Sequence, residues 1–342
     1  MGESKVFGSY LKAIRTTLGL TQEQASIRLN LLGGDLANID CVTFSRWERG
    51  ITQPSLSRRV RVLRAFENNL LPYLCSLGLD SSLKDEVEQF ELSLKQRYQD
   101  AMSIISGIDY NTPCPVEHNN IEEEELSQSN EQEFIHSLNN FHNQLKSLNI
   151  KHNLATIDLV EYQKDGRAIA YKYLSRGELV GHNIGLFFTE PTLENEIDRV
   201  KKNRLPIDVI DLRLTKPLKD KGVYSYYAIS QHSKNERVFR RQLHTEFTFL
   251  AQNAHIHHYY ASVTLKSSVD VMLKMGFSVA AYEGENPVGA IKVGSKRYTR
   301  AIMYIETSEL FTQPEFLYLL TCCGVCTHRQ CDTCTEHPDC IC

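Results

Sequence analysis

The chain has 342 residues, of which 42% are hydrophobic and 23% are charged, and its formal net charge is −4 at pH 7. This composition is ordinary for a globular protein, and the length suffices for two domains with separate cores. The charge argues against a uniformly basic nucleic-acid-binding protein, and no apolar run approaches the roughly 18–20 residues that span a bilayer.

Charge is distributed unevenly along the chain. Residues 1–66 carry ten Lys or Arg residues against five Asp or Glu residues. A basic segment on an acidic remainder is expected when one domain alone contacts phosphates. The first residues show neither a basic start nor an apolar segment of a signal peptide, so we expect a cytoplasmic protein with reduced thiols and no membrane partner.

The N-terminal residues have the periodicity of a small helical bundle. The expected helices span residues 6–18, 21–29, 40–49, 55–66 and 70–79. Thr21 is a candidate N-cap with Gln24 as its capping-box partner, and Asp40 is the candidate N-cap of the third helix. Residues 30–38 contain two adjacent glycines and predict a loop, and Gly50 ends the third helix.

The remainder of the chain changes from helical to strand-rich texture. A long amphipathic helix is predicted over residues 82–105 and another helix over residues 127–148. The expected strands are 155–162, 168–174, 179–188, 207–214, 224–229, 258–264, 279–283 and 300–306, and the helices between them are 193–202, 235–253 and 267–275. Strands followed by crossover helices predict a mixed sheet covered by helices.

We therefore expect a multidomain protein, with an all-α bundle followed by an α/β (α+β) mixed-sheet domain and a short cysteine-rich tail. The expected divisions are a helical domain over 1–80, an amphipathic helix over 81–108, an acidic linker over 109–131, the sheet domain over 132–310 and the tail over 311–342. The composition of the linker, which includes the run Glu122-Glu123-Glu124-Glu125, is too polar to bury a core.

Three short segments in the helical domain carry a family resemblance. They are GLTQEQA at 19–25, SRWERG at 45–50 and PS at 54–55. On these segments, residues 5–67 resemble the Cro/lambda-repressor-like (XRE) helix-turn-helix family. The small Ala25 lets the third helix cross the second closely, and Phe44 and Trp47 are spaced to bury against neighbouring helices. The loop at 30–38 is several residues longer than the tight turn of that family.

The resemblance implies that the third helix reads double-stranded DNA in the major groove. The expected base contacts are Cys41, Val42, Thr43 and Arg46, and the expected phosphate contacts are Gln22, Arg49, Arg58 and Arg59. An arginine can bind guanine in a bidentate manner, a valine can contact a thymine methyl group, and a helix N-terminus favours phosphate. A homodimer on paired half-sites is the expected assembly. The alternative is a helical bundle used for protein contacts.

The sheet domain carries a second resemblance, over residues 222–283. A strand at 223–230 leads into a helix at 236–253, a strand follows at 258–263, and a helix ends in Gly276-Phe277. This order resembles the later half of a GNAT-type acyltransferase. Residues 282–305, with an expected hairpin near 285–296, are more similar to the acyl-homoserine-lactone and N-acyl-amino-acid synthase branch.

The GNAT resemblance implies an acyl-CoA or acyl-carrier-protein ligand, whose pyrophosphate binds at the start of the long helix. Residues 231–238 contain no glycine, so the predicted cofactor contacts are the cations Lys234, Arg237, Arg240 and Arg241. Met272 stands where the family often has a tyrosine acid, and we assign no catalytic residue. We expect a sequence-specific DNA-binding transcriptional regulator, in which this domain is a sensor or dimerisation unit for an acyl or small-molecule ligand and the tail responds to metal or redox state. An acyltransferase with an autoregulatory helix-turn-helix is the alternative. A toxin–antitoxin or phage-type repressor is a third hypothesis.

Three histidines, His255, His257 and His258, precede a predicted strand. They are interpreted as a turn and a partly buried strand start, with a metal or acid–base site as the alternative.

Seven of the ten cysteines lie in the last 21 residues. Cys323, Cys326, Cys331 and Cys334 form two C-x-x-C pairs, Cys340 and Cys342 form a C-x-C, and His328 and His337 are alternate ligands. Such pairs are typical of a tetrahedral Zn²⁺ site or an iron–sulfur cluster. A redox thiol switch and an unstructured end remain alternatives, whereas Cys41, Cys75 and Cys114 are interpreted as ordinary cysteines.

Overall fold

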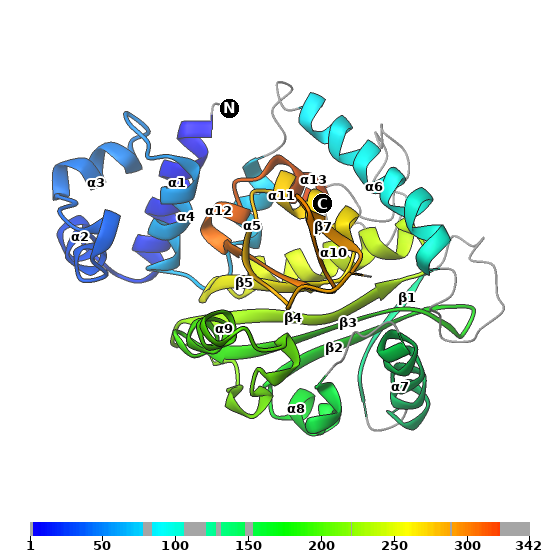
Figure 1. Ribbon diagram of the computed structural model, residues 1–342. Helices are drawn as coiled ribbons and strands as arrows, with labels where there is room; N and C mark the ends of the chain where they lie inside the picture. The colour runs from blue at the N-terminus through cyan, green and yellow to red at the C-terminus, as the bar shows by residue number, and fades with distance from the viewer. Residues whose placement is uncertain are drawn as a thin grey trace.

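The computed structural model describes residues 3–77, 84–105, 121–127, 131–147, 153–219, 221–287 and 289–321. A helical domain at the N-terminus lies beside a larger domain in which a twisted sheet separates two layers of helices (Figure 1). None of the helices in the described ranges is long and apolar enough to cross a membrane.

The helical domain is built around a cluster of buried aromatic rings. Its helices are α1 (Glu3–Thr17), α2 (Gln22–Asn30), α3 (Cys41–Glu48), α4 (Leu56–Arg64) and α5 (Leu71–Leu77), with the 3-10 turn η1 (Gly34–Leu36) between α2 and α3. Phe7 meets Trp47 edge to face with ring centroids 6.5 Å apart, and Phe44 meets Phe66 in the same way at 6.3 Å. These rings fix how α1, α3 and α4 cross.

The predicted helix ends are confirmed. The Thr21 side chain accepts from the Gln24 backbone N–H while the Gln24 side chain accepts from the Thr21 N–H, which completes the capping box. The Asp40 carboxylate accepts from the Thr43 N–H. Gly50 has φ +66°, a conformation that glycine adopts without strain.

Close contact between α1 and α3 depends on Gly8. A Cβ at that position would lie 2.4 Å from the Trp47 carbonyl oxygen. Beside this contact, the Arg15 Nε lies 2.5 Å from the Glu48 carboxylate, and both side chains are largely buried. Glu48 of α3 is therefore paired with Arg15 of α1.

The larger domain contains a seven-stranded mixed sheet with strand order β1-β2-β3-β4-β5-β9-β6. Its strands are β1 (Glu122–Glu125), β2 (Ala168–Ser175), β3 (Glu178–Thr189), β4 (Tyr224–Ser233), β5 (Ile256–Val263), β6 (Ser278–Tyr282) and β9 (Ala301–Glu306). Within the described sheet only β4 and β5 pair in parallel. The helix α10 (Glu236–Gln252) connects them, as a parallel pair requires. A separate hairpin, β7 (Ile291–Val293) with β8 (Lys296–Tyr298), occupies the predicted hairpin region.

Helices cover both faces of the sheet (Figure 1). One face carries α10 together with α6 (Lys84–Ile105), α11 (Lys266–Lys274), α12 (Thr307–Leu310) and α13 (Pro314–Thr321). The opposite face carries α7 (Glu131–Ser147), α8 (Leu159–Lys164) and α9 (Thr192–Asn203). Alternate residues of β3 and β4 enter these two cores, because successive side chains of a strand point to opposite faces.

Two predicted strands are wrong. Residues 155–162 form the 3-10 turn η3 (Leu154–Thr156) and the start of α8, and residues 207–214 form the 3-10 turns η4 (Ile207–Val209) and η5 (Leu212–Leu214). Asp158 accepts hydrogen bonds from two backbone N–H groups of α8, and Asp211 caps η5 in the same way. Such local side-chain-to-backbone bonds compete with strand pairing.

The four consecutive glutamates of the predicted linker form a strand instead. β1 pairs antiparallel with β2. Lys172 Nζ lies 2.7 Å from Glu124, and Arg241 Nε lies 3.1 Å from Glu123. Opposite charges on neighbouring elements thus stabilise a strand whose sequence alone resembles a solvated charge run.

The predicted boundary of the tail also differs. Residues 314–321 form α13, which buries Phe316 and Leu320 against the sheet domain. The sheet domain therefore includes residues beyond 310, and its described part ends at residue 321. The predicted cysteine ligands at 323–342 and Cys114 lie outside the described residues.

A buried carboxyl group lies between α10 and the sheet. Glu246 is 3% exposed and faces Tyr226, Tyr259 and Asn183. Burial raises the pKa of this carboxyl to about 7, against an ordinary value of 4.5. The folded protein therefore keeps a proton that the unfolded chain releases as the pH rises through 4.5.

This carboxyl is expected to lower stability as the pH rises. Between about pH 4.5 and 7, the shift corresponds to a loss of about 3 kcal/mol, at about 1.4 kcal/mol per pKa unit. Glu246→Gln keeps the shape of the neutral carboxyl group but cannot titrate. The free energy of unfolding in urea should therefore rise by about 3 kcal/mol for the variant relative to the wild type between pH 4.5 and 8. A difference that does not change with pH would contradict the assignment.

Candidate functional site

The two parallel strands separate midway along β4. Pairing between β4 and β5 ends at Ala228 and Ala261, although β4 continues to Ser233. On the other side of β4 the register with β3 shifts, so that Ser230 pairs with Ile184 while Ala228 pairs with Gly185. A bulge of this kind re-aims the side chains that follow it, and bulges occur often beside functional sites.

Three polar side chains from three elements meet beside this bulge. The Oγ of Ser230, a residue that is 4% exposed, lies 2.8 Å from the Nε2 of His182 on β3 and 3.1 Å from the Nε2 of His142 on α7. Phe141 packs against His182 and against His232, with ring centroids 5.1 and 4.6 Å apart. The serine hydroxyl is thus enclosed by imidazole and phenyl rings.

This cluster can act as a proton relay. A serine hydroxyl carries one proton, so Ser230 can donate to one imidazole and accept from the other. Burial lowers the pKa of His142 to about 4, so its imidazole is neutral at pH 7 and able to accept a proton. Burial also lowers the pKa of His232, to about 3. A neutral imidazole can accept a proton, but these lowered pKa values make both histidines weaker bases than an ordinary histidine.

Sequence analysis assigned no catalytic residue and missed this cluster. His182 and His142 are 48 and 88 residues from Ser230 along the chain. Only strand register and the packing of α7 bring them together. No motif signals such a set, and the visible hint, a histidine inside an apolar strand, is shared by many structural residues.

The predicted cofactor cations lie at the start of α10, directly after β4. Lys234 and Arg237 are half-buried in the connection and first turn. The Lys234 backbone N–H donates to the Val180 carbonyl, and Asn235 caps the helix by accepting from the Val238 N–H at 2.9 Å. Much of the backbone there is already hydrogen-bonded within the protein.

The other two predicted cations are held by carboxylates. Arg240 is almost completely buried and donates to both oxygens of Glu91 on α6 at 2.5 Å, and to Glu236. Arg241 pairs with Glu123 on β1 at 3.1 Å. Met272, at the position of the family's frequent tyrosine, packs on the apolar core.

The predicted reading surface extends along α3 from its first turn to its C-cap. Cys41, Val42, Arg46 and Arg49 are exposed, Val42 to 63%, whereas Thr43 is half-buried. In Figure 1, α2 and α3 lie at the end of the helical domain that points away from the sheet. The surface that would enter a DNA groove is therefore not covered by the described part of the sheet domain.

The remaining predicted phosphate contacts have intramolecular roles. Gln22 donates to Glu48 at 2.6 Å. Arg58 donates to the Asp35 carbonyl at 2.6 Å and stacks over Trp47, so the longer α2–α3 connection is held by α4. Arg59 is 6% exposed and donates to a backbone carbonyl within its own segment. Burial removes Arg59 from the set of side chains available to DNA.

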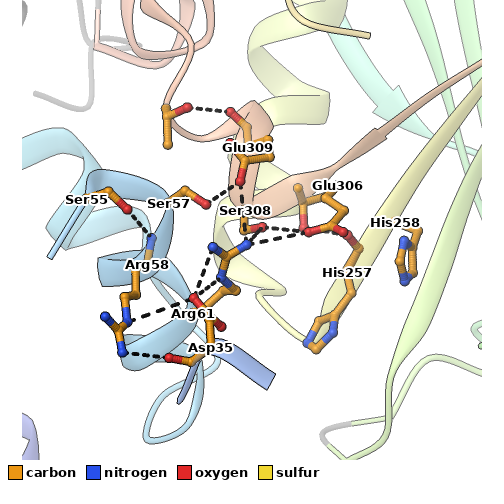
Figure 2. Close-up of polar contacts among 12 residues, drawn as sticks. Asp35, Ser55, Ser57, Arg58, Arg61, His257, His258, Glu306, Ser308 and Glu309 are labelled. Atoms are coloured by element: carbon orange, nitrogen blue, oxygen red, sulfur yellow. Dashed lines mark hydrogen bonds and ion pairs between the residues drawn. The ribbon is translucent and has the colours of Figure 1, made fainter. Parts of the chain in front are cut away.

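Side chains of α4 also connect the helical domain to the sheet domain (Figure 2). Arg61 lies 3.2 Å from Asp35 of the helical domain and 3.5 Å from Glu309 on α12, and Ser57 donates to the same Glu309 at 2.5 Å. Two backbone hydrogen bonds extend this junction, from the Leu70 N–H to the Ala251 carbonyl and from the Ala254 N–H to the Asn68 carbonyl. The two domains are thus joined through the carboxyl end of α10 and through α12.

Of the three histidines, His255 lies in the turn and His257 and His258 lie at the start of β5, as the interpretation favoured by the sequence has it. His255 is buried in the turn and precedes the strand start at residue 256. His258 contacts Glu190 at 3.2 Å and the Tyr304 hydroxyl at 3.1 Å. In the part of the chain that the structure describes, no group of three or more His, Cys, Asp or Glu side chains is arranged to hold a metal ion.

Comparison with known proteins gives similarities to solved structures only. No family model and no curated protein matches the chain. A probable acetyltransferase from Staphylococcus epidermidis is 13% identical, covering 55% of this chain and 99% of its own, with a TM-score of 0.31. Spermidine N-acetyltransferase from Vibrio cholerae, in complex with CoA and spermine, is 14% identical over 57% of this chain and 100% of its own, with a TM-score of 0.31.

A Bacillus subtilis acetyltransferase in complex with CoA is 14% identical over 55% of this chain and 99% of its own, with a TM-score of 0.29. TM-scores near 0.3 carry no argument about fold or activity. The strand order, the parallel β4–β5 pair and its connecting helix α10 are themselves consistent with a GNAT-like α/β domain.

Proposed function

We propose that the sheet domain is a GNAT-type acyltransferase that uses a phosphopantetheine thioester, carried by CoA or by an acyl carrier protein. The observation that carries the proposal is the position of Ser230. It lies just past the point where β4 and β5 separate, between two imidazoles. Ligands of open α/β sheets bind at the carboxyl ends of parallel strands.

The proposed chemistry is direct transfer to an amine. The acceptor nitrogen attacks the thioester carbon, an amide C–N bond forms, the C–S bond breaks and the sulfur leaves as a thiolate. The amine proton passes to Ser230 Oγ while the serine proton passes to an imidazole nitrogen of His142 or His182. General-base catalysis of this kind contributes typically 10²–10⁴ in rate.

The sequence alone favoured a sensor, because residues 231–238 lack glycine and residue 272 is methionine. The Ser230 cluster supplies a proton acceptor that depends on neither position. We therefore propose an acyltransferase rather than a sensor.

The test is turnover of acyl-CoA by the full chain. Acyl-CoA donors of increasing chain length are incubated with a panel of primary amines and amino acids. Free CoA and acylated amine are separated by chromatography, because the ten cysteines of the chain would react with a thiol-specific dye. Equal amounts of CoA and acylated amine support the proposal, and neither product with any donor, acyl carrier protein included, would overturn it.

We propose, as a second function, that the helical domain binds double-stranded DNA through α3. The observation that favours it is the exposure of Cys41, Val42 and Arg46 on a helix that faces away from the sheet domain. The test is a fluorescence-anisotropy titration of the full chain with the DNA upstream of its own gene. Binding that a scrambled duplex does not compete supports the proposal, whereas equal competition would count against specific recognition.

A further inference from the structure

The helix α6 lies across the carboxyl ends of the two parallel strands. β4 leads into α10 and β5 leads into α11, so the starts of both helices lie at this edge of the sheet. Side chains of α6 contact the end of β4 and the starts of α10 and α11. Tyr98 hydrogen-bonds Ser233 at the end of β4, and Arg97 Nε donates to Ser268 in the first turn of α11 at 3.2 Å.

The contact between α6 and α10 includes an ion pair whose side chains are largely buried. Glu91 of α6 accepts two hydrogen bonds from Arg240, whose side chain is 6% exposed. The Arg97 guanidinium stacks over the Phe239 ring with its carbon 4.1 Å from the centroid. Phe90 and Leu94 bury the apolar side of α6. A fixed bidentate pair of this kind is among the stronger ionic contacts in proteins.

The carboxylate of Glu91 is therefore an anion bound to Arg240, near the start of α10. Helix N-termini attract anions, and arginine binds carboxylate and phosphate with the same two-pronged geometry. A second carboxylate, Glu123 of β1, holds the adjacent Arg241. Both anions, Glu91 and Glu123, thus come from the chain itself. The helix α6 belongs neither to the β4–α10–β5 unit nor to the core of the helical domain.

We infer that α6 is an internal competitor of the acyl donor, with Glu91 on Arg240 in place of a donor phosphate. The inference rests on the proposed acyltransferase function and assigns its regulation. The donor binds when α6 moves away from the starts of α10 and α11, and the arrangement described here is the closed one. Donor affinity is then set by the contacts that hold α6 as well as by the donor site.

Calorimetric titration of the full chain with CoA tests this competition. Glu91→Gln removes the charge but keeps hydrogen-bonding groups, and Arg240 retains Glu236 as a partner. Glu86→Gln is the matched control, since it removes one negative charge from an exposed position of the same helix. We expect Glu91→Gln to bind CoA roughly tenfold more tightly than the wild type, which corresponds to about 1.4 kcal/mol, and Glu86→Gln to match the wild type.

Equal or weaker CoA binding by Glu91→Gln overturns the inference. CoA binding by none of the proteins overturns both the inference and the acyltransferase proposal. If Glu91→Gln binds CoA more tightly but no acyl transfer is detected, the competition by α6 stands and the acyltransferase proposal falls. If acyl transfer is detected but Glu91→Gln binds CoA as the wild type does, the acyltransferase proposal stands and the competition by α6 falls. If Glu91→Gln does not fold, Tyr98→Phe replaces it, because it deletes the contact with Ser233 without a change of charge.

A second readout follows α6 directly. Hydrogen exchange of the α6 amides in the wild-type chain should become faster when CoA is bound, because the helix leaves its contacts. Slower exchange of α6 on CoA binding would mean that the helix closes over the donor, and would contradict competition.

Discussion

Ser230→Ala is expected to lower the rate of acyl transfer by about 10²-fold or more while leaving KM for the donor nearly unchanged. The hydroxyl lies within hydrogen-bond distance of both His182 and His142, at 2.8 and 3.1 Å. Alanine keeps the strand and its packing but removes the path by which the acceptor proton reaches an imidazole. Steady-state kinetics with acyl-CoA and the amine acceptor measures this effect.

Ser225→Ala is the matched control. Ser225 lies on the same strand and is also buried, at 2% exposure, but it pairs with Phe188 and His258 rather than with the histidine cluster. Its removal should leave kcat within a few-fold of the wild type. Equal losses in the two variants would show that Ser230 serves only the stability of β4.

The pH profile of kcat/KM should show no decrease near pH 6.5, where an ordinary histidine becomes protonated. Burial lowers the pKa of His142 to about 4, so its imidazole stays neutral well below pH 6.5. Apart from the decrease caused by protonation of the acceptor amine itself, we therefore expect the enzyme to add a decrease in kcat/KM only near pH 4, because protonation of the base removes its ability to accept a proton. A limb near pH 6.5 that is absent in His142→Gln would contradict the burial of this group in the active protein.

Arg46→Ala is expected to weaken specific DNA binding by about 1–3 kcal/mol, roughly 5- to 150-fold, and to relax selectivity at one base pair. Arg46 is exposed in the last turn of α3, one turn after Val42. An arginine in that position can bind a guanine with two hydrogen bonds. Anisotropy titrations at fixed salt measure the affinity for the operator and for a scrambled duplex.

Arg213→Ala provides the control for this loss of charge. Arg213 lies in the sheet domain with its side chain 77% exposed, so its removal changes net charge equally and leaves α3 intact. We expect operator binding to be nearly unaffected by Arg213→Ala. Similar losses in both variants would mean that long-range charge, rather than α3, governs the binding.

Local chemistry made the helical domain predictable from sequence. The capping box at Thr21, the cap at Asp40 and the glycine at 50 each act within a few residues, and each has the predicted geometry. The β4–α10–β5 unit was predicted for the same reason, since its strands and helix carry strong periodicity. The order of strands around this unit is consistent with a GNAT-like α/β domain.

Long-range contacts explain what the sequence could not predict. The strand β1 exists because Lys172 and Arg241 neutralise its glutamates, and these partners are distant in the chain. The α4 arginines are surface charges by sequence, yet Arg61 joins the domains and Arg59 is buried. A register shift in β4 aims Ser230 at the histidines, and no local pattern encodes that shift.

Transfer of an isotope-labelled acyl group from acyl-CoA to an amine, followed by mass spectrometry, tests the central claim most directly. Wild type and Ser230→Ala are compared in the same assay, with label measured in the amine and in the free acid. The proposed mechanism predicts that the wild type places the label in the amine and that the variant loses about 10²-fold of this rate. Label that stays on CoA, or that reaches the amine equally fast with both proteins, would contradict it.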